Sequence, residues 1–155
     1  MKTPIMTLAA LAVLALHTAQ SESKILANVD KSGVGVQGYD PTAFFTEGRP
    51  VKGDPSHAST YRGVTYHFAS SAAKVRFDAG PADYEPQFGG YCAYGVSRGS
   101  ASPIQVEAFQ IVDGRLLLQY SGKVRDLFNA DAAGNLKLAD EKWPALVEKK
   151  GQAAR

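Results

Sequence analysis

The stretch that decides the fold is Tyr61–Gly95, which reads YRGVTYHFASSAAKVRFDAGPADYEPQFGGYCAYG. Its first part predicts a β-hairpin over residues 59–69, because Arg62-Gly63 suits a tight turn and aromatic residues flank this pair. Successive side chains of a strand point to opposite faces, so the core is expected to receive Val64, Tyr66 and Phe68. His67 is then expected on the other face.

The same stretch continues into a helix and then into the segment that carries the only cysteine, Cys92. Ser70 or Ser71 can accept a hydrogen bond as the N-cap of a helix over residues 72–79. Residues 88–96 (FGGYCAYGV) are rich in glycine and aromatic side chains, which lets the backbone approach a neighbour or a ligand closely. A binding site is therefore expected near this segment.

A second hairpin–helix unit follows, and its sequence does not match the first. Asp113-Gly114 predicts the turn of a hairpin over residues 108–120. Helices are predicted over residues 122–130 and 135–149, and Pro144 is expected to kink or split the second of them. The expected fold class is α+β: one small domain with a β-hairpin plus helix unit, a second β-hairpin and C-terminal helices.

Residues 1–21 are predicted to be a signal peptide. Lys2 is followed by a charge-free apolar run over residues 5–16, and small residues near Ser21 fit a cleavage site. This run is too short to span a bilayer. A buried N-terminal helix is the alternative interpretation. Export predicts a periplasmic or secreted protein.

The rest of the chain is divided into an N-terminal arm (22–37), a domain (38–147) and a flexible charged tail (148–155). None of these three segments contains an apolar run that is expected to be long enough to span a membrane. The 17 basic and 15 acidic residues form no long basic run, so nucleic acid is not expected as a partner. The sequence also lacks the common hydrolase, phosphate-loop and zinc-protease motifs, and no enzymatic reaction is predicted.

A spaced set of residues in this half of the chain resembles the YHS domain family. Its members are Tyr61, Gly63, Tyr66, His67, Phe68, Ser70, Phe77, Pro81 and Tyr84. The flanking segments Gly38-Tyr39-Asp40-Pro41 and Gly89–Gly95 look like those of exported single-domain members. The resemblance implies a YHS-like domain built on the first hairpin and its helix.

YHS domains attached to copper pumps are similar to zinc- or copper-binding modules, and they bind through cysteines. In this chain the first of those positions falls on Ala43 and the second on Ala69, and the third falls on Ala72 or Ala73. Thiolate sulfur is the ligand that makes such sites select zinc or copper(I). The resemblance therefore supports the fold and leaves the family's own metal site without its thiolates.

A different metal site is predicted from the remaining donors. Cys92 with His67 and His57 would give two nitrogens and one sulfur, a set that suits copper or zinc with one open position. The alternative is that Cys92 is a buried, inert side chain and the histidines are ordinary hairpin and loop residues. One cysteine cannot form a disulfide within the chain, so an exported thiol is buried, bound to something or paired with another chain.

Tyrosines supply a second candidate site. Tyr39, Tyr66, Tyr91 and Tyr94 could line a ligand pocket with apolar walls and a few hydroxyl contacts, or could simply fill the core. The predicted function is an exported YHS-like binding domain that handles copper or zinc in the periplasm, with a metal ion or small ligand as its partner. The alternative is a metal-free structural or interaction domain.

Overall fold

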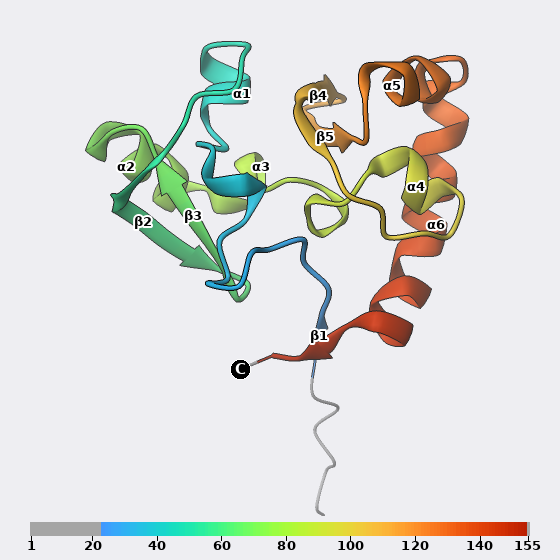
Figure 1. The fold of residues 1–155 in the computed structure, drawn as a ribbon, viewed down its shortest axis with the longest axis horizontal. Helices are drawn as coiled ribbons and strands as arrows, with labels where there is room; N and C mark the ends of the chain where they lie inside the picture. The colour runs from blue at the N-terminus through green and yellow to red at the C-terminus, as the bar shows by residue number, and fades with distance from the viewer. Residues whose placement is uncertain (1–22, 155) are drawn as a thin grey trace, which may run out of the picture.

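Two hairpin–helix units follow one another in the structure, a computed structural model that describes residues 23–154. The first unit consists of η1 (Val36–Gly38), α1 (Ala43–Thr46), β2 (Asp54–Tyr61), β3 (Val64–Phe68), α2 (Ser71–Ala79) and α3 (Pro81–Tyr84). The second unit consists of η2 (Phe88–Gly90), α4 (Ala93–Ser97), β4 (Gln105–Val112), β5 (Arg115–Gln119), α5 (Gly122–Asn129) and α6 (Ala132–Lys150). Figure 1 shows the first unit on the left and the second on the right.

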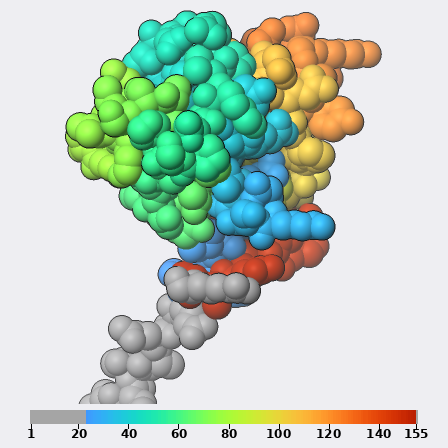
Figure 2. Space-filling model, turned by 60° about the vertical axis from the view of Figure 1, so that its left-hand side comes forward, coloured from blue at the N-terminus to red at the C-terminus, as the bar shows by residue number. Residues whose placement is uncertain are grey.

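The two ends of the described chain meet at the base of the molecule. β1 (Lys24–Ile25) pairs antiparallel with β6 (Gln152–Ala153), and the Lys24 ammonium lies 2.6 Å from a Glu148 carboxylate oxygen. Figure 2 shows the blue arm between the green first unit and the red C-terminal residues. The prediction of a flexible tail from residue 148 is therefore corrected: α6 continues through Lys150, and pairing with β1 orders the residues after it.

The units share the same order of backbone conformations, although their side chains differ. Each begins with consecutive residues of positive φ, Val36–Gly38 in η1 and Phe88–Gly90 in η2. Each hairpin turns through two more such residues, Arg62-Gly63 and Asp113-Gly114, as the sequence predicts. Positive φ is uncommon outside glycine, so its recurrence at matching places identifies the second unit as a structural repeat of the first.

The helix after each hairpin also starts in the same way. Ser70 accepts a hydrogen bond from the Ala73 N–H at 3.1 Å, and Ser121 accepts one from the Val124 N–H at 3.2 Å. Each hairpin has one register shift, between Asp54 and Ala58 or between Gln105 and Phe109. Sequence comparison of the units could not detect this repeat, because backbone conformation is kept while the side chains are not.

The structure has two apolar cores, and β5 contributes to both. The first core joins the first unit to Cys92, Ile104 and Val106 of the second, whereas the buried residues of the second core all belong to the second unit. Phe77 of α2 and Phe128 of α5 are fully buried at matching places in the two cores. Leu116 and Leu118 join the first core, whereas Leu117, on the opposite face of the strand, joins the second. A strand buried on both faces holds the two units together as one domain.

The mixed α+β prediction is confirmed, and so is the orientation of β3. Its burial alternates, with Val64, Tyr66 and Phe68 buried and His67 half-buried. The helix is not split at Pro144, since α6 continues through this residue. No helix within residues 23–154 is long and apolar enough to cross a membrane. The predicted signal peptide lies outside the residues that the structure describes.

The repeat predicts that equivalent core positions contribute similarly to stability. Phe77→Ala and Phe128→Ala are each expected to lower the free energy of unfolding by about 3–5 kcal/mol, because each removes a fully buried ring and leaves a cavity. Urea unfolding measures both. Val75→Ala, at a site that is 68% exposed, is the control and should change stability by less than about 0.5 kcal/mol. A large loss for only one phenylalanine would contradict two equivalent cores.

Candidate functional site

The sulfur of Cys92 lies inside the molecule, where it is held by three hydrogen bonds. Cys92 is 1% exposed and is the N-cap residue of α4. Its sulfur accepts the N–H groups of Gly95 at 3.4 Å and Tyr120 at 3.3 Å. Its thiol donates to Gln119 Oε1, also at 3.4 Å. All of its polar capacity is therefore used within the second unit.

The repeat places Asp40 at the position that matches Cys92. The Asp40 Oδ1 atom accepts the Thr42 N–H at 2.8 Å, and Oδ2 accepts the Ala69 N–H at 2.9 Å. Ala69 follows β3 as Tyr120 follows β5. In each unit, one side chain thus fastens the start of a short helix to the end of a hairpin. The Cys92 sulfur in the second unit and the Asp40 carboxylate in the first therefore accept equivalent backbone hydrogen bonds.

The histidines lie in the other unit, on the first hairpin. His57 is on β2 and His67 on β3, where His67 is paired with Ala58. The pKa of the Asp54 carboxyl is lowered chiefly by the Ser56 N–H bond, and to a smaller extent by both imidazoles. Within residues 23–154, no three histidine, cysteine, aspartate or glutamate side chains are grouped so that they could hold a metal ion. The structure therefore does not bring Cys92, His57 and His67 together.

The four tyrosines predicted to share a pocket are dispersed. Tyr39 lies under the Lys52 ammonium, 4.6 Å from its ring centre, and Tyr94 lies under the Arg98 guanidinium at 4.8 Å. The Tyr91 hydroxyl donates to the Ala27 carbonyl at 3.3 Å. Tyr66 alone of the four lines the cavity between the two units.

This cavity has a volume of about 420 Å³ and opens between the two units and the arm. Apolar side chains form much of its wall, from Ile25 and Leu26 of the arm, Val64 of β3, and Trp143 and Val147 of α6. Pockets that hold small molecules usually have volumes of about 300–1,000 Å³ and combine apolar walls with a few polar groups. The size and lining of this cavity match that description.

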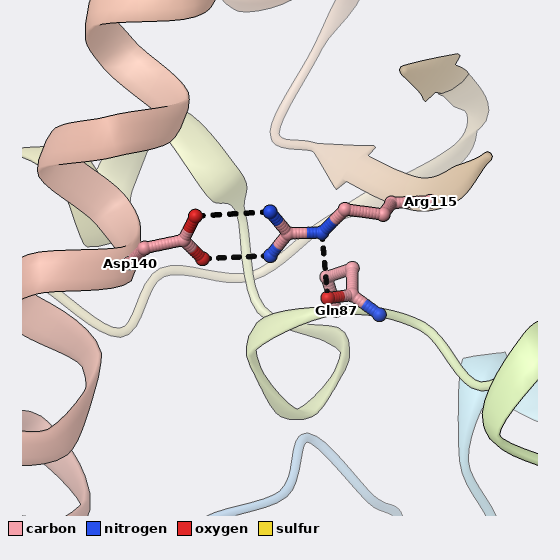
Figure 3. A network of polar contacts seen from close by, with 3 residues as sticks. All are labelled: Gln87, Arg115 and Asp140. Atoms are coloured by element: carbon pink, nitrogen blue, oxygen red, sulfur yellow. Dashed lines mark hydrogen bonds and ion pairs between the residues drawn. The ribbon is translucent and has the colours of Figure 1, made fainter. Parts of the chain in front are cut away.

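On the side of the second unit, the polar wall is a network around Arg115 (Figure 3). Its guanidinium makes two bonds to the Asp140 carboxylate, at 2.9 and 2.7 Å, and its Nε donates to Gln87 Oε1 at 2.9 Å. The bonds to Asp140 raise the pKa of Arg115 further. Arg115 also lies 5.5 Å from the Phe88 ring centre. The Arg115 guanidinium is held by Asp140, Gln87 and the Phe88 ring, so this part of the wall has a fixed shape.

On the side of the first unit, the polar wall is the ion pair of Arg62 and Glu85. Their closest atoms are 2.7 Å apart, and the Arg62 guanidinium lies 5.1 Å from the centre of the Tyr61 ring. Burial raises the pKa of Glu85, although Arg62 opposes this rise. The carboxylate is therefore partly withdrawn from water at the edge of the cavity.

Tyr66 is the most buried polar side chain of this wall, at 4% exposure. Burial, and then the charge of Glu85, raises the pKa of its phenol well above the ordinary value of 10.0. Its hydroxyl is therefore neutral at physiological pH. Among the described residues, the buried side-chain polar atoms without a hydrogen-bond partner are Gln110 Nε2 and Gln119 Nε2, so the Tyr66 oxygen is not one of them.

Comparisons with protein-family models, with curated proteins and with solved structures found no match to this chain. The YHS resemblance accordingly stays a prediction. Sequence reasoning missed the charged walls of the cavity, because Arg62 with Glu85 and Arg115 with Asp140 are far apart in the chain and form no motif. Their only local signal was the arginine in or just after each hairpin turn.

The phenol of Tyr66 is expected to titrate after the ordinary tyrosines, because its charged form is buried beside Glu85. Absorbance at 295 nm, followed against pH, measures this. In Tyr66→Phe the late step should be missing. The unfolded chain releases this proton near pH 10.0 and the native chain later, so alkali should destabilise the wild type more than the variant above that pH. Identical curves for both proteins would contradict the buried, neutral phenol.

Proposed function

We propose that this protein is an exported binding domain of the YHS type, in the periplasm or outside the cell, in which Cys92 is a structural residue. The observation that supports the structural role of Cys92 is the set of three hydrogen bonds at its buried sulfur. Metal coordination through this sulfur would need a thiolate, because the thiolate is the form that binds metals. It would also break the bond to Gln119, because a thiolate has no proton to donate.

The match between Asp40 and Cys92 adds to this argument. A carboxylate and a thiol fill the same place in the two units, and both accept the backbone N–H that follows the hairpin. What the two side chains share is an acceptor atom at the correct position, not affinity for copper or zinc. The copper or zinc hypothesis of the sequence requires a different arrangement, in which the second unit opens and at least one histidine moves to the sulfur.

Variants of Cys92 separate a hydrogen-bonding role from simple core filling. Cys92→Ser keeps an acceptor, whereas Cys92→Val keeps an apolar group and leaves two buried N–H groups unpaired. We expect Cys92→Val to be less stable than Cys92→Ser by about 1–3 kcal/mol in urea unfolding, because an unsatisfied buried donor costs about that much. The reverse order would show that Cys92 acts only as a small apolar residue.

Thiol labelling and metal titration test the alternative that Cys92 is an accessible ligand for copper or zinc. The native protein should resist a thiol reagent and should react fully once it is denatured, because the sulfur is buried. Copper and zinc should bind equally to the wild type and to Cys92→Ser. One equivalent of either metal, bound by the wild type and lost in Cys92→Ser, would contradict the structural role and support metal handling.

A further inference from the structure

We propose that the second hairpin encloses a small inorganic anion of the halide class, held by the amides of Gln110 and Gln119 and by the Arg125 guanidinium. This inference goes beyond the proposed function and concerns the second unit alone. Three features carry it: two buried amide nitrogens without an acceptor, their common place on one face of the hairpin, and a guanidinium beside them that forms no ion pair within residues 23–154.

Gln119 is a fully buried amide at a place where the first unit has an aromatic ring. It is the last residue of β5 and matches Phe68, the last residue of β3, and both are 0% exposed. The Gln119 oxygen accepts the Tyr94 N–H at 3.0 Å, which fixes the orientation of the amide, because its own N–H groups could not take that place. Its nitrogen is buried and has no acceptor within residues 23–154. A buried donor lowers stability unless an acceptor reaches it.

The second unpartnered nitrogen belongs to Gln110 and lies on the same face of the hairpin. Gln110 of β4 pairs with Leu117 of β5, and Gln119 lies two residues beyond Leu117. Directly paired residues share a face of a sheet, and so do residues two apart along a strand. Such diagonal neighbours lie about 7–8 Å apart, a span that two glutamine side chains can close around one small atom.

A positive charge lies beside these two amides. α5 packs against the hairpin (Figure 1), and its Arg125 donates to the Phe109 carbonyl at 3.2 Å. Phe109 is next to Gln110 in β4, and it pairs with Leu118, which is the neighbour of Gln119 in β5. Arg125 is half-buried, and none of the ion pairs found within residues 23–154 includes it. A half-buried guanidinium with N–H groups to spare favours a charged acceptor.

The chemistry of these groups favours an anion over a water molecule. The unpartnered buried side-chain atoms of the described residues are both donors, and both are closed to solvent, so their acceptor must be small enough to be enclosed. A water molecule would accept from them but would need acceptors for its own hydrogens. A halide only accepts, and Arg125 balances its charge. The acidic neighbours in the chain, Glu107 of β4 and Asp126 of α5, are exposed, so solvent screens their repulsion.

The test compares chloride with gluconate, an anion too large to be enclosed, on the full chain at constant ionic strength. Chloride should raise the melting temperature, because a ligand of the native state stabilises it by mass action, and the NMR line of chloride should broaden when the protein is added. Gln110→Met removes an unbonded amide nitrogen and should weaken chloride binding at least about tenfold, and Arg125→Met should do the same. Gln105→Met is the control, since this glutamine of β4 is exposed, and it should bind as the wild type does.

Each outcome decides the proposal. Equal melting temperatures in chloride and gluconate, without broadening of the chloride line, overturn it, and so does unchanged chloride affinity in either Gln110→Met or Arg125→Met. Magnetisation transfer from water to the Gln119 side-chain amide, in a protein that does not respond to chloride, would identify an internal water molecule as the acceptor instead. The proposed role of Cys92 is measured on its own variants by unfolding and labelling, so the two proposals fail separately.

Discussion

The constraint on which the rest of the structure depends is the burial of β5 on both faces. Leu116 and Leu118 fill the first core and Leu117 the second, so this short strand is the shared wall of two cores. A hairpin alone is only marginally stable in water, and a two-stranded sheet with one solvated face would gain little. By placing β5 between the units, the chain buries both of its faces, and the second unit completes the core of the first.

The position of β5 also fixes the segment that links the units. Pro86 forms a parallel bridge with Leu116, and the Gln87 N–H donates to the Leu116 carbonyl at 2.9 Å. In the first unit, Val34 bridges Thr65 and the Gly35 N–H donates to the carbonyl of Thr65. The same pairing thus leads into both units. It places Glu85 at the seam, next to Arg62, which is why one wall of the cavity is charged.

Sequence reasoning predicted the elements well and the relations between them poorly. The turns at Arg62-Gly63 and Asp113-Gly114 could be predicted, because their conformation is a local property of two residues. The repeat could not, because Asp40 and Cys92 act alike only through an acceptor atom whose position depends on the fold. The residues of the predicted metal site are not grouped within residues 23–154 for the same reason: the histidines and Cys92 belong to different units, and sequence spacing does not report such distances.

The cavity lies where the two units stop resembling each other. After its hairpin and helix, the first unit ends in the four-residue helix α3, whereas the second unit continues at the matching place into the 19-residue helix α6. Asp140, Trp143 and Val147 lie in this added length, and all three line the cavity. They have no counterpart in the first unit, whose chain instead turns into the link between units. A perfect repeat would leave this side of β3 bare. The longer helix and the arm beside it enclose the space, so the hollow that Tyr66 faces is a product of asymmetry between two otherwise similar units.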